Sequence, residues 1–407
     1  MPTAEHAIAA GFLPLLDSVL LIVAREKGFA EAEGVDLHLV RETSWANIRD
    51  RIAVGHFDVA HMLAPMPIAA TLGLNPIAVP FVAPMALGLG GNAVTVSTAL
   101  WNRLEQAGAP SDFDAAAVGA ALAAVVAAGG PKLRLGVVHP HSGHNYELRY
   151  WLAACGIRPD RDIEIVVLPP PLMPDALASG ALDGYCVGEP WNSAGVDSGS
   201  GVIATVKAAI WRSSPEKVLG TTEGWATANP DALAALIRAL HKTALWCTDP
   251  GNAPEAAAIL AREAYLNVPA ALIEHGLSGR LEAAPGRIVP VADFFIPQAK
   301  AANFPWASHA LWFYSQMVRW GHVKHTADNA RLAAASYRPD LYRAALAPLG
   351  VAVPAASSKV EGAFPDPTAV GSVRGPLSLG PDGFFDGKVF DPDLLDAYIA
   401  DQSDDAD

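Results

Sequence analysis

The chain is poor in charged residues and in cysteine, and it has no long apolar run. Charged residues make up 17% of its 407 residues, while hydrophobic residues make up 51%. This balance is typical of a folded protein with a large core and excludes a disordered chain. Acidic residues outnumber basic ones, and the formal net charge is −14. Because nucleic-acid-binding proteins need a basic face, the composition argues against a direct nucleic-acid partner.

These absences also bear on location. No segment approaches the ~18–20 apolar residues that a membrane span requires, and the run Val19–Ala24 is far shorter. The first residues lack the basic stretch of an export signal. The cysteines Cys155, Cys186 and Cys247 are scattered and odd in number, which favours buried thiols in a reducing compartment. We therefore expect a cytoplasmic protein with no membrane partner.

A short module occurs twice, 125 residues apart: AVGHFDVAHMLAP from Ala53 to Pro65, and ASGALDGYCVGEP from Ala178 to Pro190. In each copy a helical stretch reaches a glycine, which suits the left-handed conformation at a helix end. An aspartate then turns the chain into a short apolar strand, which stops at a proline that cannot donate to a strand ladder. Two copies predict two similar α/β lobes with a cleft between them. The shared inner positions are Gly55 and Asp58 in the first copy and Gly180 and Asp183 in the second.

Strand-like and helix-like segments alternate through the first half of the chain, which predicts mostly parallel sheets flanked by helices. Such sheets bind ligands at the carboxyl ends of their strands. Two helices expected there begin at Ser44 and Ser142, and the free N–H groups of helix N-termini suit anions. The expected organisation is a first lobe over 1–97 and 206–345, a second lobe inserted over 98–205, and a surface-wrapping segment over 346–407 that ends in the acidic tail DDAD.

Two residues in the strand-end loops have both a structural and a functional interpretation. Trp45 opens a helix and is either a packing aromatic or a ligand contact. His144 follows His139 and His141, and a histidine cluster raises the possibility of a metal site. No Cys, Asp or Glu joins these residues at a recognised ligand spacing. A His144 that donates a hydrogen bond to an anion is therefore the simpler interpretation.

Two charged residues are ambiguous in the same way. Lys217 has the local pattern of a solvated lysine that pairs weakly with Glu216. Glu189 could act as a general acid or base, yet no nucleophile elbow, phosphate loop or metalloprotease motif accompanies it. The residues by themselves thus favour a binding protein over an enzyme.

Several blocks of the chain, in order, resemble the nitrate- and bicarbonate-binding branch of the type II periplasmic-binding-protein fold, the NrtA/CmpA/NasS family. They include ETSWANIRDRIAVGHFDVAHMLAPMPIAATLGL, GGNAVTVS, DGYCVGEPWN and PEKVLGTTEGWA, and they fall within residues 8–330. The resemblance implies a two-lobed α/β fold whose interlobe cleft binds a small planar oxyanion. It implies no cofactor and no metal.

The resemblance also assigns site residues. The family's tryptophan falls on Trp45, its histidine on His144 and its cleft lysine on Lys217, while Asn92 stands where we expect glutamine in nitrate transporters. Bicarbonate-binding relatives are expected to carry an acidic residue and a metal ion in place of the lysine. A lysine therefore favours nitrate or nitrite. Strand-end residues complete the expected ligand-binding set: Pro170, Gly188, Glu189 and Pro190.

Within this family the chain is most similar to the cytoplasmic NasS-type sensors. That similarity implies a nitrate/nitrite sensor that sequesters a NasT-type ANTAR antiterminator, an RNA-binding protein, and releases it when the anion binds. Two alternatives stay open. One is the solute-binding subunit of a nitrate ABC transporter without its leader. The other is an enzyme similar to the pyrimidine-precursor synthases, which would carry a cysteine-rich iron motif and a lysine for pyridoxal phosphate.

Overall fold

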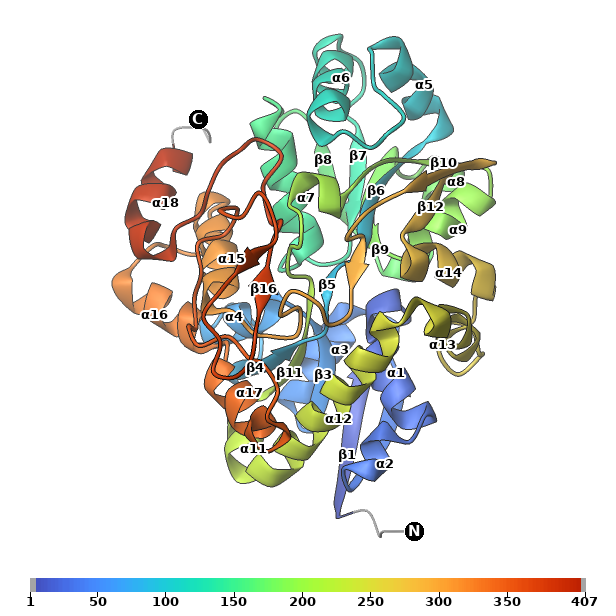
Figure 1. Ribbon diagram of the computed structural model, residues 1–407. Coiled ribbons are helices and arrows are strands. Elements are labelled where there is room, and N and C mark those ends of the chain that lie inside the picture. The colour runs from blue at the N-terminus through green and yellow to red at the C-terminus, as the bar shows by residue number, and fades with distance from the viewer. Residues whose placement is uncertain (1–4, 404–407) are drawn as a thin grey trace.

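The computed structural model describes residues 5–403 and consists of two α/β lobes, one above the other in Figure 1. The predicted acidic tail over 404–407 lies outside the described residues. Each lobe contains a five-stranded sheet flanked by helices. The two-lobed architecture that the repeated module predicts is confirmed.

The sheet of the first lobe has the strand order β2-β1-β3-β11-β4. β1 pairs in parallel with β2 and β3, while β11 is antiparallel to both β3 and β4. Four strands therefore run in one direction and only β11 runs against them. The strands are β1 (His6–Phe12), β2 (Val35–Arg41), β3 (Val59–Leu63), β4 (Phe81–Ala86) and β11 (Lys217–Thr222).

The second sheet repeats this plan in the order β10-β6-β9-β7-β8. β7 is parallel to β8 and β9, and β6 is antiparallel to β9 and β10. β6 is thus the counterpart of β11. The strands are β6 (Asn92–Ser97), β7 (Arg134–Val137), β8 (Glu164–Val167), β9 (Gly184–Gly188) and β10 (Gly201–Val206).

The repeated module forms the central strands β3 and β9, whose bounds differ by 125 residues. Gly55 and Gly180 both have positive φ, +75° and +71°, as the helix-end interpretation predicts. Asp58 accepts a hydrogen bond from the backbone N–H of Ala9 (2.8 Å), and Asp183 accepts one from that of Arg134 (2.7 Å). Each aspartate therefore ties the entry of a central strand to the neighbouring strand.

The structure places one strand differently from the sequence analysis. The segment 92–97, expected to end the first lobe, is β6 of the second sheet, while β10 lies in that sheet as expected and ends at Val206. The chain thus crosses between the sheets over 87–91 and returns over 207–216. Apolar patterning predicts that a segment is a strand, but it does not specify which sheet completes the hydrogen-bond ladder.

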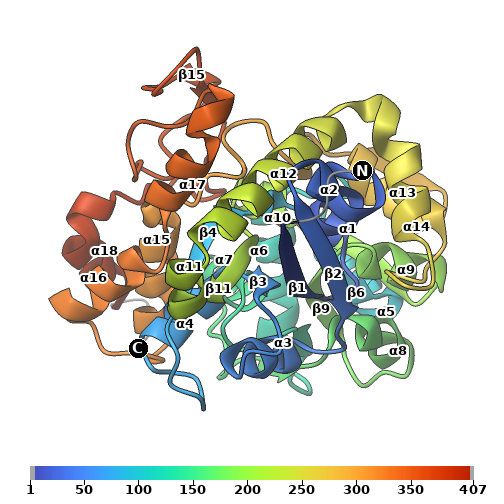
Figure 2. The same cartoon turned by 90° about the horizontal axis from the view of Figure 1, so that it is seen from below.

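Helices cover both faces of the first sheet (Figure 2). α1 (Val19–Glu26) and α12 (Pro230–Thr248) pack against one face, and α3 (Trp45–Ala53) packs on β3 and β11 at the other. The other α-helices are α2 (Phe29–Ala32), α4 (Pro65–Thr71), α5 (Thr98–Gln106), α6 (Ala115–Ala127), α7 (Gly143–Ala154), α8 (Met173–Ala178), α9 (Trp191–Asp197), α10 (Lys207–Ile210), α11 (Glu223–Ala228), α13 (Ala253–Leu260), α14 (Ala270–Ser278), α15 (Ala307–Arg319), α16 (Ala327–Ala335), α17 (Pro339–Leu346) and α18 (Leu395–Ser403). None of the helices within residues 5–403 is long and apolar enough to cross a bilayer.

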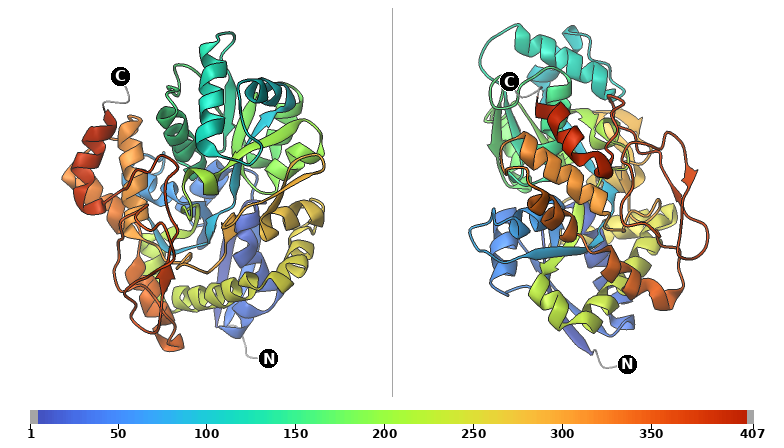
Figure 3. Two further views of the ribbon diagram at one scale, coloured as in Figure 1. Left: turned by 45° about the horizontal axis from the view of Figure 1, so that its top comes forward. Right: turned by 90° about the vertical axis from the view of Figure 1, so that its left-hand side faces the viewer.

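The segment after α17 winds along one side of the molecule (Figure 3). A buried ionic group attaches it to α15: Lys359 pairs with Glu361 and with Asp382 (2.7 Å), and Ser308 of α15 donates to Glu361 (2.6 Å). Small two-stranded pairings complete the fold, between β5 (Leu89–Gly90) and β14 (Phe295–Ile296), β12 (Arg280–Ala284) and β13 (Arg287–Pro290), and β15 (Thr368–Ala369) and β16 (Ser378–Leu379).

Candidate functional site

The two reversed strands bring one polar residue from each lobe to the interlobe side. β11 begins at Lys217, opposite Leu63, the last residue of β3. β6 begins at Asn92, opposite Gly188, the last residue of β9. Leu63 and Gly188 are equivalent in the repeat, so Lys217 and Asn92 occupy corresponding positions. Both lie at the carboxyl ends of the central strands, where ligands bind in sheets of this type.

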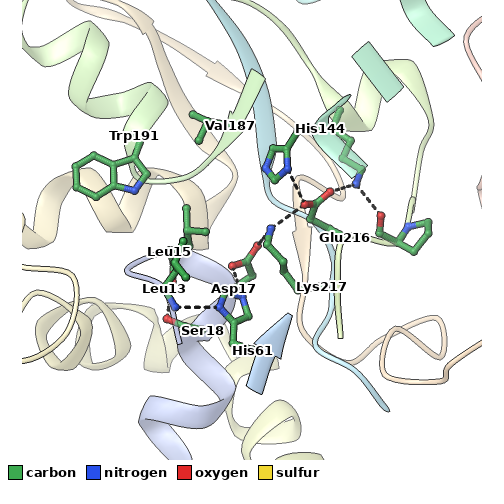
Figure 4. Close-up of polar contacts among 12 residues, drawn as sticks. Leu13, Leu15, Asp17, Ser18, His61, His144, Val187, Trp191, Glu216 and Lys217 are labelled. Carbon is green, nitrogen blue, oxygen red and sulfur yellow. Dashed lines mark hydrogen bonds and ion pairs between the residues drawn. The ribbon is translucent and has the colours of Figure 1, made fainter. Parts of the chain in front are cut away.

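Lys217 is a buried residue and not a solvated loop lysine, and its side chain lies between those of Asp17 and Glu216 (Figure 4). Its Nζ donates to Asp17 Oδ2 (2.8 Å) and to Glu216 Oε1 (2.7 Å). The same ammonium lies 5.5 Å from the ring centroid of Trp45, at the first position of α3. Trp45 is 1% exposed, so packing and ligand contact are both compatible with its position.

Asp17 lies two residues before α1 and does not act as its cap. α1 begins at Val19, and no side chain caps it. Asp17 instead accepts a hydrogen bond from His61 Nε2 (2.9 Å), while His61 Nδ1 accepts from the backbone N–H of Leu13 (3.4 Å). These contacts use both nitrogens of a neutral imidazole, and burial lowers the pKa of His61. Burial would raise the pKa of Asp17, but Lys217 and His61 outweigh it and lower the pKa to about 2.

The ionic contacts continue from Glu216 into the second lobe. Glu216 pairs with Lys207 of α10, and the Nζ of Lys207 lies 2.9 Å from Oε1 of Glu147 on α7. Acids and lysines therefore alternate across the interface between the lobes. None of the side chains in this group is more than 4% exposed. We call the group the buried charge cluster; it comprises Asp17, His61, His144, Glu147, Lys207, Glu216 and Lys217.

The positive and negative charges of the buried charge cluster nearly cancel at neutral pH. Burial raises the pKa of Glu147 to about 8, although Lys207 opposes the shift. Burial would also raise the pKa of Glu216, but His144 and the ammonium groups of Lys207 and Lys217 hold it well below its usual range. At pH 7 the two ammonium groups thus face two carboxylates, while Glu147 is mainly protonated. Lys217 is a local cation whose charge is already compensated.

Three side chains near Lys217 carry buried polar atoms that have no hydrogen-bond partner among the described residues. They are Trp45 Nε1, both amide atoms of Asn92 and both ring nitrogens of His144. His144 Nδ1 lies 3.2 Å from Glu216 Oε1, but the contact does not have hydrogen-bond geometry. Leaving a buried polar group unpaired costs about 1–3 kcal/mol, so native structures seldom do so without a reason. Unused N–H groups from both lobes, beside an ammonium, suit a small molecule that only accepts hydrogen bonds.

Gly188 is placed beside these groups. A Cβ added to it would lie 3.1 Å from Asn92 Oδ1 and 3.3 Å from Leu15 Cδ2, both closer than an ordinary contact. The missing side chain therefore leaves room for Leu15 of the first lobe beside the second lobe. The assignment of Gly188 to the site stays a prediction, in which the residue provides space and not a contact.

The remaining three predicted residues lie further along the same edge. Glu189 accepts from the backbone N–H of Ser193 (3.1 Å) at the start of α9, and burial raises its pKa to about 7. Pro190, joined to Glu189 by a cis peptide bond, is the N-cap of the same helix. These two residues position α9. Pro170 begins a short 3₁₀ helix after the edge strand β8, two strands out from β9.

The histidines that precede His144 form a separate group. His141 Nδ1 contacts the hydroxyl of Tyr146 (2.9 Å), which also contacts His322 Nδ1 (2.8 Å). The backbone N–H of His141 donates to His139 (3.0 Å). Within residues 5–403 no group of three or more His, Cys, Asp or Glu side chains is arranged to hold a metal ion.

Sequence reasoning missed four members of the cluster and underestimated a fifth. Asp17 had a usable signal: it precedes Ser142 by 125 residues, and Ser142 does cap its helix, α7, by accepting from the N–H of Asn145 (3.0 Å). A buried aspartate at a helix start that does not cap the helix must have another partner. His61, Glu147 and Lys207 gave no local signal, and Glu216 was expected to pair only weakly with Lys217.

Comparison with known proteins gives matches over nearly the whole chain. The NMT1-like family matches residues 2–261. The nitrate/nitrite binding protein NrtA of Synechococcus elongatus is 33% identical over 403 residues, which cover 96% of this chain and 85% of that protein. The bicarbonate transport ATP-binding protein CmpC of Synechocystis is 35% identical, and the match covers 96% of this chain but 54% of that protein.

The fold matches a solved structure equally well. The crystal structure of the periplasmic nitrate-binding protein NrtA from Synechocystis has a TM-score of 0.84 and 28% identity, and the match covers 98% of both chains. The two-lobed periplasmic-binding-protein fold is thereby confirmed.

Proposed function

Because the chain belongs to the NMT1-like family and has the fold of the NrtA-type solute-binding proteins, we propose that it binds nitrate or nitrite between its two lobes. It is not an enzyme, since the relatives that it matches along most of both chains are NrtA-type binding proteins, and the synthase alternative is set aside. The ligand is a proposal that depends on the site, because relatives named for nitrate and for bicarbonate are about equally similar.

The observation that carries the proposal is the set of unpartnered donors around Lys217. Trp45 offers an unused N–H beside the ammonium, and Asn92 offers another at the corresponding strand end of the second lobe. Nitrate and nitrite only accept hydrogen bonds and stay charged at physiological pH. Charge-assisted hydrogen bonds are about twice as strong as neutral ones, so Lys217 is expected to contribute most. A ceiling of about 1.5 kcal/mol per heavy atom limits a four-atom ligand to a Kd on the order of tens of micromolar.

Titration calorimetry with nitrate, nitrite and bicarbonate tests the ligand. Trp45→Phe keeps an aromatic ring but removes the unused N–H, so nitrate affinity should fall about tenfold, as expected for one charge-assisted hydrogen bond. Lys217→Glu should abolish nitrate binding. Trp211→Phe is the matched control, because its Nε1 is also buried without a partner but lies in a different aromatic cluster. Bicarbonate binding tighter than nitrate, or equal losses in both tryptophan variants, would contradict the assignment.

For the cellular role we propose a cytoplasmic sensor that releases a NasT-type antiterminator when the anion binds. What supports this role is the ionic contact between lobes at the site, through which ligand occupancy can change the shape seen by a partner. Affinities for ligand and partner must then be reciprocally coupled. The second candidate is the solute-binding subunit of a nitrate importer, supported by the names of the matched transport proteins.

Co-purification separates the two roles. A sensor should retain a small ANTAR-domain protein in the absence of nitrate and lose it when nitrate is added. An importer subunit should instead associate with a membrane permease and its ATP-binding protein. Nitrate-insensitive association with the ANTAR protein, or none, would reject the sensor role.

A further inference from the structure

The buried charge cluster has three carboxyl groups but only two lysines. Lys207 lies between Glu147 and Glu216, and Lys217 lies between Glu216 and Asp17. Two of the acids can therefore be ionised with full compensation. A bound oxyanion adds a further negative charge to a group whose side chains are nearly all inaccessible to water.

A buried charge without compensation is strongly unfavourable. Asp17 and Glu216 already balance the two ammonium groups, so an ionised Glu147 would add a second uncompensated negative charge to that of a bound oxyanion. We propose that Glu147 must be protonated when the oxyanion binds, so that anion binding takes up a proton at this residue whenever it is ionised in the free protein. This inference rests on the proposed function and adds a regulatory residue to it.

Geometry identifies Glu147 as the acid that holds the proton. Asp17 accepts hydrogen bonds from both Lys217 and His61, and Glu216 contacts both lysines, so each of these carboxylates has two partners. Glu147 has one cation, Lys207, and neither of its oxygens has a hydrogen bond of good geometry. The pKa of Glu147 is already raised to about 8 by burial.

The groups that face Glu147 come from four elements. Lys207 of α10 and Lys217 of β11 favour its ionised form, and Glu216, just before β11, opposes it. Cys186 of β9 is nearby, but burial raises the pKa of its thiol, so it stays uncharged. His144 is on the same helix, α7, and burial lowers its pKa to about 3, so it is neutral above pH 5. Glu147 is thus the group of this cluster that changes charge between pH 7 and 9.

The test is the pH dependence of nitrate affinity, because nitrate itself does not titrate in this range. The Kd of the unaltered protein should be constant between pH 6.5 and 7.5 and then rise towards tenfold per pH unit above pH 8. Calorimetry at pH 8.5 in Tris and in bis-tris propane, which differ in ionisation enthalpy and contain no oxyanion, should show net uptake of a fraction of one proton.

Glu147→Gln is the decisive variant, since an amide keeps the shape and an acceptor for Lys207 but cannot ionise. Its nitrate affinity should match that of the unaltered protein at pH 7 within about threefold and stay flat to pH 9. Glu361→Gln is the matched control, because Glu361 is also buried and paired with a lysine, Lys359, but belongs to the C-terminal attachment. It should keep the pH dependence.

Two outcomes would overturn the inference alone: nitrate binding without proton uptake at pH 8.5, or a Glu147→Gln variant with the original pH dependence. Failure of the unaltered protein to bind nitrate at pH 7 would reject the proposed function and this inference with it. Because the unaltered protein alone gives the proton count, the test does not depend on the folding of either variant.

Discussion

At the scale of residues, the candidate site contains a buried amide that is unfavourable for the stability of the ligand-free protein. Asn92 is 0% exposed, and neither atom of its amide has a partner among the described residues. An apolar side chain of similar size would avoid the desolvation penalty of that amide, about 1–3 kcal/mol. Under the proposed function, we expect this amide to pair with the bound anion.

Asn92→Leu should separate stability from binding. We expect the ligand-free variant to be more stable by about 1 kcal/mol, because an unpaired polar group is removed. Its affinity for nitrate should fall about tenfold. Urea unfolding with and without nitrate measures both quantities. Lower stability without nitrate would show that the amide has a structural role.

The sequence located several residues of the candidate site but few of the charges that surround them. Trp45, Asn92, His144, Gly188 and Lys217 lie in or near the buried charge cluster, and their contact with a ligand stays a prediction. Their supporting charges could not be predicted, because they lie far apart along the chain. Asp17, for example, pairs with residues 44 and 200 positions away. Pairing over such separations is set by the fold and leaves no local pattern.

At the scale of elements, the repeated module predicted the central strand of each sheet but not which strands pair with it on the side of the reversed strand. β3 and β9 match the two copies of the module, including the positive φ angles of Gly55 and Gly180. The reversed strand β6 was placed in the wrong sheet. A strand that crosses between lobes has the same apolar pattern whichever sheet it joins. Only its hydrogen-bond partners decide to which sheet it belongs.

The two module glycines should be energetically equivalent. A Cβ added at Gly55 or Gly180 meets no atom within 4 Å, so alanine would strain only the backbone. Each substitution should lower the free energy of unfolding by about 1 kcal/mol, and the two effects should add, since the sites lie in different lobes. Nitrate affinity should not change.

Gly224→Ala in α11 is the control. A Cβ added at Gly224 also meets no atom within 4 Å, but Gly224 has no positive φ, so the substitution should be neutral or stabilising in urea unfolding. Unequal losses at Gly55 and Gly180 would contradict the equivalence of the two modules.

At the scale of the whole molecule, the ion pair between Lys207 and Glu216 joins the lobes. Lys207 follows the last strand of the second sheet, and Glu216 precedes β11 of the first. The chain crosses between the sheets nearby, at 87–91, where Gly88, Gly90 and Gly91 all have positive φ. This crossing is buried and pairs with β14, so we expect the Lys207–Glu216 pair to be the contact through which a ligand shifts the balance between an open and a closed arrangement.

Lys207→Met should shift that balance towards the open arrangement. The variant is expected to fold, because Glu216 keeps Lys217 as a partner and Glu147 is mainly protonated at pH 7. Loss of the interlobe pair should increase the radius of gyration measured by small-angle X-ray scattering, and nitrate should reverse the increase. The Kd of the variant for nitrate should rise about tenfold. This corresponds to ~1.4 kcal/mol of binding free energy that is used to close the lobes.

Lys242→Met is the matched control, since Lys242 pairs with Glu33 within the first lobe. If both variants scatter like the unaltered protein and bind nitrate equally well, the Lys207–Glu216 pair does not control closure of the lobes. The proposal that a change in lobe arrangement signals to a partner protein would then have no support.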